Sequence, residues 1–402
     1  MKDPVTAMTG ITYDRESIEH WLLKAKDTTC PVTKQPLPKD SDLTPNHTLR
    51  RLIQAWCIAN AENGVDRIPT PKSPLNKSHV LKLISDLNVP ELYIKALRKM
   101  EELAGESERN RRCMVEAGMI KAMVLLIIKC FKEGIRKGLE EALRILHLIW
   151  TPTVENKQLV KENFEFIESI IWVLECEVDN HVEVKSQAVL VLKMIIEFAS
   201  ANLLERLKLD FFKQIVKVLK EKITQQATKA LLHVLIEVCP WGRNRVKIVD
   251  AGAVFELIEL ELRNQEKKTT ELIFSLLAHL CSCADGRAQL LKHAAGIAMV
   301  SKKILRVSPA TDDRAVHILS LISKFSATHE VLLEMLKVGT VSKLCMVLQA
   351  NSEKHTKNEA REALRLHSNV WNNSPCIAVY LLTKDPSRRP VLRESLISFP
   401  PK

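Results

Sequence analysis

Glycine, proline and aromatic residues are all scarce in this chain of 402 residues. The 11 glycines and 17 prolines make up about 7% of the sequence, whereas an average chain carries roughly 12% of the two together. Aromatic residues contribute only 5%, while Leu, Ile, Val, Lys and Glu are abundant. This balance excludes a large β-sandwich, a collagen or a low-complexity chain, and it predicts a protein built mainly of helices.

Long apolar runs and paired cysteines are also missing. The longest runs, such as Met123 to Ile128, are far shorter than the roughly 18 residues that a membrane span requires. None of the ten cysteines forms a C-x-x-C pair, so neither a disulfide framework nor a zinc-finger spacing is present. We therefore expect a reduced, intracellular protein of the cytoplasm, without a membrane span, a metal or a cofactor.

Basic residues outnumber acidic ones and give a formal net charge of +11. They are scattered along the chain, and no block of five or six like charges occurs. The pattern favours a mildly basic, solvated helical surface over a nucleic-acid site. We expect no nucleic-acid partner.

A composition break near the N-terminus divides the chain. Pro69, Pro71 and Pro74 alternate with polar residues, which excludes a helix and predicts an extended linker. The Pro and Arg content after Tyr380 indicates an unstructured extension. We therefore expect four segments: a module over residues 1–62, a linker over 63–78, a long helical region over 79–380 and a disordered tail over 381–402.

The long helical region repeats with a period of 42 to 46 residues. One register relates seven positions: Ala96, Ala142, Ala188, Ala230, Phe274, His317 and Ala363. Glycines recur 22 residues after four of them, at Gly118, Gly252, Gly296 and Gly339. Glycine suits a tight corner between helices, because it adopts a positive φ without strain. The period fits armadillo or HEAT repeats, and the glycine corner favours the armadillo type. We expect a right-handed armadillo α-solenoid.

The N-terminal module has a mixed α+β pattern. Residues 5–8 and 11–13 flank Thr9-Gly10 and predict a short hairpin. Asp14 is expected to cap a helix that carries Trp21, and a proline-rich loop follows. A second helix is expected to open at Thr44-Pro45. Its inward-facing side chains are expected to be Leu49, Leu52, Ile53 and Trp56.

Such a small module has a thin core and usually needs a metal or disulfides. Only Cys30, Cys57, His20 and His47 are available, and they lack paired spacings for zinc. Polar hydrogen bonds are therefore expected to hold the module together.

Four segments of this module carry a family resemblance: MKDPV, TGITYDRESIEHWL, TCPVTKQPL and TPNHTLRRLIQAWC. They resemble the U-box, a metal-free relative of the RING finger. A U-box followed by a linker and armadillo repeats resembles the plant U-box armadillo family of ubiquitin ligases, most closely its stress- and immunity-linked subgroup.

The resemblance implies a RING-type ubiquitin-protein transferase without a covalent nucleophile. Such a protein binds a ubiquitin-conjugating enzyme charged with ubiquitin, and its armadillo groove holds a protein substrate whose lysine attacks the thioester. Proximity and orientation supply the rate gain. Whether the chain forms a homo-oligomer stays open.

The resemblance also places the docking surface for the conjugating enzyme at Val5, Trp21, Pro31 and Lys34. Lys34 stands where many such ligases have a cation that contacts both the enzyme and ubiquitin. Two of these residues also have a purely structural interpretation: Trp21 as a core side chain and Lys34 as an ordinary solvated lysine. Cys30 is expected to be a small buried residue.

Family members carry a first loop with an aromatic–Cys–Pro–Ile pattern just before the KDPV segment, and we expect that loop to be absent here. A non-catalytic armadillo scaffold is therefore the alternative function. A nuclear-import receptor is disfavoured, because the six Trp residues do not recur at the repeat period.

Overall fold

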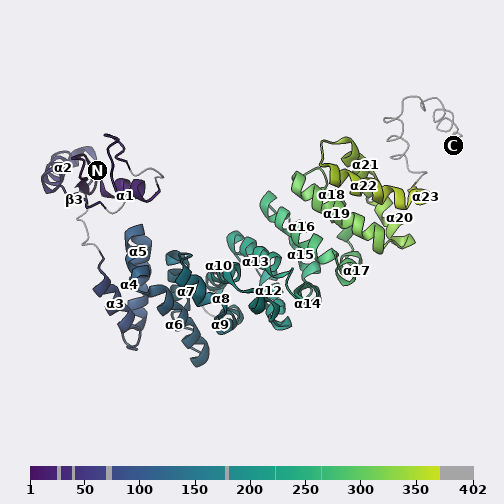
Figure 1. Cartoon of the computed structure of the whole chain (residues 1–402), viewed down its shortest axis with the longest axis horizontal. Coiled ribbons are helices and arrows are strands. Elements are labelled where there is room, and N and C mark those ends of the chain that lie inside the picture. The colour runs from purple at the N-terminus through teal and green to yellow at the C-terminus, as the bar shows by residue number, and fades with distance from the viewer. Residues whose placement is uncertain are drawn as a thin grey trace. The chain divides into compact units, whose positions relative to one another are not determined.

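The computed structural model describes residues 1–24, 29–38, 41–68, 75–176, 181–221, 223–263 and 265–371. The chain divides into two compact units, Met1–Leu75 and Asn76–Lys402. Figure 1 labels the elements of both, and each unit is described here by itself. The second unit is almost entirely helical in the residues described, as the sequence predicts.

The first unit combines a small sheet with two α-helices. Its elements are β1 (Pro4–Thr6), β2 (Thr12–Asp14), α1 (Arg15–Lys24), β3 (Thr44–Pro45), α2 (His47–Ala59) and a 3-10 turn, η1 (Ala61–Asn63). The strands lie in the order β2-β1-β3, and both pairings are antiparallel. The β1–β2 hairpin is confirmed, and it turns at Gly10 with φ +80°.

Two expectations for the second helix are wrong. Thr44-Pro45 does not open it but forms β3 beside β1, and the helix begins at His47 with Asn46 as its cap. Asn46 is the better cap because its side chain accepts a hydrogen bond from the Leu49 N–H at 3.0 Å. Leu52 and Trp56 do not face inward. They are 63% and 59% exposed, since the small sheet covers little of α2, and only Cys57 of this helix is buried.

The core of the first unit is correspondingly small. Its buried side chains are Val5, Ala7, Ile18, Leu22, Cys30 and Leu37. Ile11, Tyr13 and Leu43 pack against this cluster from its edge. A core of this size contributes little hydrophobic stabilisation, so the polar contacts described below matter for the fold.

The second unit opens with a helix pair and continues with six groups of three helices in the residues described. The pair is α3 (Lys77–Asp86) and α4 (Tyr93–Glu106). The first three groups are α5 (Glu108–Glu116), α6 (Met119–Glu133) and α7 (Leu139–Ile149); α8 (Val154–Lys161), α9 (Phe164–Glu175) and α10 (His181–Phe198); and α11 (Ala201–Glu205), α12 (Leu209–Lys220) and α13 (Gln225–Val238).

The remaining groups are α14 (Asn244–Asp250), α15 (Ala253–Leu262) and α16 (Lys267–Cys281); α17 (Ala284–Lys292), α18 (Gly296–Lys303) and α19 (Pro309–Phe325); and α20 (His329–Lys337), α21 (Thr340–Gln349) and α22 (Lys354–Leu366). A short helix, α23 (Ser368–Trp371), follows them. One group per sequence period is what an armadillo solenoid requires, so the predicted architecture is confirmed.

The third helices of successive groups pack side by side. Starting from α4, each contacts the next in the series α7, α10, α13, α16, α19 and α22 (Figure 1). We call these seven helices the helix ladder. The register positions of the repeat lie on it, and most of them are buried because each faces the neighbouring group. Stacking therefore buries apolar surface that a single group would leave exposed.

The glycine corners separate the first and second helices of a group. Gly252 has φ +82° and lies between α14 and α15, as predicted, and Gly118 and Gly339 adopt nearly the same conformation. Gly296 is different, because it has no positive φ and forms the first residue of α18. A Cβ there would lie 2.1 Å from the Leu290 carbonyl oxygen, so close packing explains this glycine.

Some sequence-based expectations fall outside the described residues. They are the disordered tail over 381–402 and the three linker prolines. The helix α3 begins at Lys77, so it includes the last two residues of the predicted linker. Within the part of the chain that the structure describes, no helix has the length and apolar character needed to cross a bilayer.

Candidate functional site

The first candidate site is the loop that follows α1 in the first unit. Its two ends meet in a single antiparallel bridge between Thr29 and Pro36. Within it the Cys30 N–H donates to the Gln35 carbonyl at 2.8 Å, and the Lys34 N–H donates to the Cys30 carbonyl at 3.0 Å. The backbone therefore closes on itself and presents the intervening residues at a defined tip.

Trp21 joins α1 to this loop. Its indole N–H donates a hydrogen bond to the Thr29 carbonyl at 2.9 Å, and 39% of the residue remains exposed. Trp21 is thus neither a core side chain nor a free one. The bond fixes the ring against the base of the loop and leaves part of the indole available for contact.

The tip of the loop combines apolar and basic side chains. Pro31 is half-buried, whereas Val32 is 63% exposed, and no sequence pattern marks Val32 as a site residue. Lys34 is exposed and adopts a left-handed backbone with φ +60°, which is uncommon for a residue other than glycine. The strained conformation points to a loop shape that the rest of the module imposes.

Val5 occupies a different environment from the other predicted docking residues. It lies in β1 with its side chain 0% exposed, and it belongs to the core cluster. It packs in the same buried cluster as Cys30 of the loop. The exposed surface therefore consists of Trp21, Pro31, Val32 and Lys34, and we call it the loop surface.

Cys30 anchors the loop from inside. Its sulfur accepts hydrogen bonds from the Thr9 hydroxyl at 3.4 Å and the Thr33 N–H at 3.3 Å, and it lies 3.0 Å from the Tyr13 hydroxyl. Burial raises the pKa of the thiol, but the hydrogen bonds from Thr33, Thr9 and Tyr13 outweigh that effect and lower the pKa to about 6. Burial and the same contact with Cys30 raise the pKa of Tyr13 to about 12.

Cys30 is 0% exposed, so it is a buried structural thiol, as predicted. The hydrogen bonds that converge on its sulfur connect the hairpin turn, β2 and the loop. In a zinc-binding module a metal ion would join such segments. No group of three or more metal-ligating side chains lies together in the described parts of the chain.

A second polar cluster holds the N-terminal strand. The Asp14 carboxylate accepts hydrogen bonds from the backbone N–H groups of Lys2 and Asp3, the latter at 2.8 Å. Asp3 in turn pairs with Arg15 at 2.7 Å and lies 3.7 Å from an Arg50 nitrogen. These contacts tie β1 to both helices of the unit, so polar bonds do stabilise the module as the sequence indicates.

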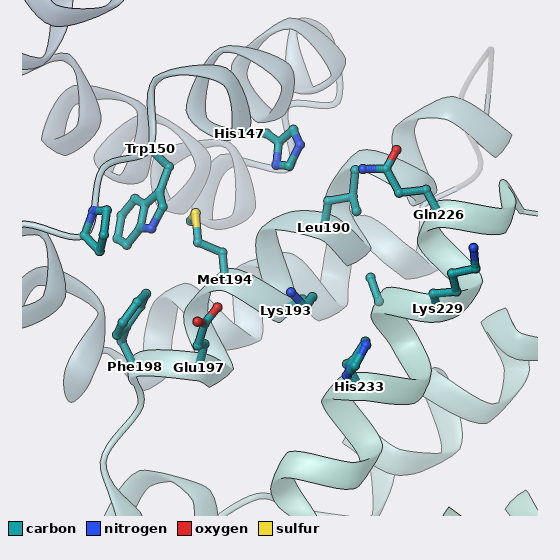
Figure 2. A pocket seen from close by; sticks show the side chains of 12 residues that line it. His147, Trp150, Leu190, Lys193, Met194, Glu197, Phe198, Gln226, Lys229 and His233 are labelled. Atoms are coloured by element: carbon teal, nitrogen blue, oxygen red, sulfur yellow. The ribbon is translucent and has the colours of Figure 1, made fainter. Parts of the chain in front are cut away.

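The second candidate site is a pocket of about 450 Å³ on the helix ladder of the second unit. Figure 2 shows its lining side chains, which come from α7, α10, α13 and the turn after α7. Trp150, Met194 and Phe198 line one end, and His147, Lys193 and His233 line the other. No sequence pattern predicts this group, because its members come from three separate helices.

Comparison with known protein families gives a match for each of the two units. A family model for the U-box domain matches residues 1–62, and one for the plant U-box protein ARM repeat region matches residues 79–387.

Three similar relatives come from Arabidopsis thaliana. E3 ubiquitin-protein ligase PUB24 is 43% identical over 429 residues, which cover 96% of this chain and 93% of that protein. E3 ubiquitin-protein ligase PUB23 is 43% identical, with 94% of this chain and 92% of that protein covered. U-box domain-containing protein 25 is 32% identical, with 92% and 89% covered.

Solved structures show a likeness of fold alone. A chain from a study of the interaction between cadherin and beta-catenin aligns with a TM-score of 0.60 at 12% identity, covering 80% of this chain and 58% of that one. An engineered protein aligns with a TM-score of 0.52 at 21% identity, covering 73% and 68%. With its two units matched in this order, the chain belongs to the plant U-box armadillo-repeat protein family.

Proposed function

We propose that this chain is a ubiquitin-protein ligase whose loop surface binds a ubiquitin-charged conjugating enzyme. The observation that carries the proposal is the half-exposed Trp21, fixed by its hydrogen bond to Thr29 beside a loop that exposes Val32. Rigid aromatic and apolar side chains on a fixed loop are typical of protein-binding hot spots. The names of the relatives PUB24 and PUB23 support the same activity.

Catalysis in this proposal needs no nucleophile from the ligase. Cys30 and Cys57, the two cysteines of the first unit, are 0% and 4% exposed, so neither is placed to accept ubiquitin as a thioester. Ubiquitin would pass directly from the conjugating enzyme to a substrate lysine. The ligase would contribute by raising the local concentration of the two partners and by orienting them.

Lys34 would add an electrostatic contact at the edge of the same surface. Its ammonium group is a flexible point charge, whereas an arginine would offer a planar pair of donors. Its left-handed backbone orients the start of the side chain, which limits the conformational freedom lost on binding. The helix ladder of the second unit would hold the substrate.

The test is a titration of the full chain with a panel of purified ubiquitin-conjugating enzymes. Replacing Trp21 with Ala removes a partly exposed hot-spot ring and is expected to cost on the order of 2 kcal/mol of binding free energy, or about thirtyfold in Kd. Trp21→Phe keeps a ring but loses the bond to Thr29, so we expect an intermediate loss.

Trp241 provides a matched control for this experiment. It is 38% exposed, almost the same as Trp21, but lies in the second unit. Trp241→Ala should leave binding of the conjugating enzyme unchanged, and both variants must keep the parent's unfolding temperature. Equal binding by Trp21→Ala and the parent would contradict the loop surface. A parent chain that binds none of the enzymes but retains substrate would favour the scaffold alternative.

A further inference from the structure

The pocket on the helix ladder has two chemically different ends. At one end, the rings of Trp150 and Phe198 lie 6.3 Å apart between centroids with an angle of 35°, and Met194 lies beside them (Figure 2). These side chains form an apolar recess of the kind that accepts one large aliphatic or aromatic residue.

The other end is basic and carries Lys193 in its middle. Figure 2 shows the Lys193 side chain between His147 on α7 and His233 on α13. Burial and the nearby Lys193 charge lower the pKa of both histidines, which keeps them neutral near pH 7. Lys193 is therefore a central cation flanked by two imidazoles that offer hydrogen bonds.

Several cations of the ladder have carboxylate partners on neighbouring groups. Arg144 pairs with Glu101 at 2.6 Å and also contacts Glu140 and Glu183. Lys324 pairs with Glu362 at 2.9 Å. These pairs neutralise the charge of the ladder where its helices meet.

Lys193 lies in the pocket without such a partner on the described parts of neighbouring groups. Among the residues that the structure describes, no carboxylate forms an ion pair with it. Lys229, which also lines the pocket, is already paired with Glu266. A half-buried cation without a counter-charge gains most from a carboxylate that arrives with a ligand.

We propose that this pocket binds a substrate segment in which an acidic residue adjoins a bulky apolar residue. The inference rests on the proposed function, in which the repeats hold the substrate, and it adds the chemistry of the segment. The apolar side chain enters between Trp150 and Phe198, and the carboxylate pairs with Lys193. Glu197 also lines the pocket, one residue from Phe198 and one helical turn from Lys193, and its charge disfavours a carboxylate at the apolar end.

A peptide fits these features better than a nucleic acid. Glu197 in the pocket lining repels a phosphate backbone, and Arg144 and Lys324 of the ladder are already paired with carboxylates. One cation without an ion pair among the described residues, beside an apolar recess, matches a single carboxylate.

The experiment measures binding of the full chain to a fluorescein-labelled probe peptide, Gly-Ser-Gly-Glu-Phe-Gly-Ser-Gly, by fluorescence anisotropy. Two matched peptides carry Gln in place of Glu or Ala in place of Phe. A single-stranded oligonucleotide of eight thymidines serves as a competitor. The protein variants are Lys193→Gln, Lys193→Glu and the control Lys213→Gln, whose lysine is 58% exposed on α12, away from the pocket.

We expect saturable binding of the Glu-Phe probe and a loss of roughly five- to tenfold in affinity for Lys193→Gln, since a half-exposed charge pair is partly screened. Lys193→Glu should lose more, and Lys213→Gln should bind like the parent. The Gln peptide should bind the parent and Lys193→Gln with the same low affinity, because it has no carboxylate that could pair with Lys193. The Ala peptide should also bind weakly.

Three results would overturn the inference: no saturation with the parent up to about 1 mM probe, no effect of Lys193→Gln, or tighter binding of the oligonucleotide than of the peptide. Peptide binding requires no ubiquitin transfer. A chain that binds the probe but transfers no ubiquitin would therefore contradict the proposed function and leave this inference standing. A chain that transfers ubiquitin but does not bind the probe would contradict this inference and leave the proposed function standing.

Discussion

Three glycines of the second unit are expected to respond differently when each is replaced by alanine. At Gly252 a new Cβ would meet no atom within 4 Å, but the backbone has φ +82°. At Gly105 near the end of α4 the space is equally open, and φ is not positive. At Gly286 in α17 a Cβ would lie 2.0 Å from the Leu280 carbonyl oxygen. The set separates backbone strain from steric overlap.

The expected changes in the free energy of unfolding differ in sign among the three sites. Placing an L-residue in the left-handed region costs about 1–2 kcal/mol, so Gly252→Ala should destabilise by that amount. Gly252→Val adds a β-branched side chain to the same strain and should cost about 1–3 kcal/mol. Gly105→Ala should instead stabilise by up to about 1 kcal/mol, since alanine loses less conformational entropy in a helix. Gly286→Ala should cost at least roughly 1–3 kcal/mol, because the obstructing atom is backbone.

Thermal unfolding of the full chain, followed by circular dichroism at 222 nm, measures these effects. For a unit of this size, 1 kcal/mol corresponds to a shift in Tm of roughly 2 °C. Hydrogen exchange of the α14 and α15 amides localises the effect at the corner. Equal responses of Gly252→Ala and Gly105→Ala would refute the reasoning, because the two sites differ mainly in φ.

The remaining predictions concern the loop, a histidine and metal. Lys34→Asn should stabilise the first unit by about 0.5–1 kcal/mol and Lys34→Val should destabilise it, because Asn tolerates the left-handed backbone and a β-branched residue does not; slower or faster exchange of the β1–β2 amides checks this. A hydrogen bond to Glu359 raises the pKa of His317, so the stabilisation is present below about pH 6.5 and is lost as the pH rises through the higher folded pKa. Protection factors of the α19 and α22 amides, which are corrected for the intrinsic pH dependence of exchange, should therefore fall between pH 6 and 8, and His317→Gln should remove that fall. Prolonged treatment with a strong chelator should leave the circular dichroism spectrum unchanged, and a loss of signal would indicate a metal site.

The repeat architecture could be predicted from the sequence because its signals are local. A regular period, amphipathic runs and a recurring corner glycine each reflect contacts within one group or with the next. The register positions Ala96 and Ala142 proved to lie on successive ladder helices for this reason. The U-box motifs are likewise continuous segments, so they can be recognised in the sequence without knowing which distant residues they contact.

Other features depend on contacts between distant residues, and the sequence did not reveal them. The strand β3 exists only because β1 lies beside it, and residue preferences at Thr44-Pro45 gave no sign of it. The exposure of Leu52 and Trp56 depends on how little of α2 the sheet covers. That Lys193 has no ion-pair partner among the described residues emerges only once neighbouring helices are placed, since partners such as Glu101 of Arg144 are distant in sequence.

The most direct test of the central claim is ubiquitin transfer with purified components. The full chain is mixed with ubiquitin, activating enzyme, ATP and a conjugating enzyme that it binds, and the products are separated with and without reducing agent. The account predicts ubiquitin joined to lysines through bonds that resist reduction, and a sharp loss of this product for Trp21→Ala but not for Trp241→Ala. A reducible ubiquitin adduct on the chain itself, or undiminished transfer by a folded Trp21→Ala variant, would contradict it.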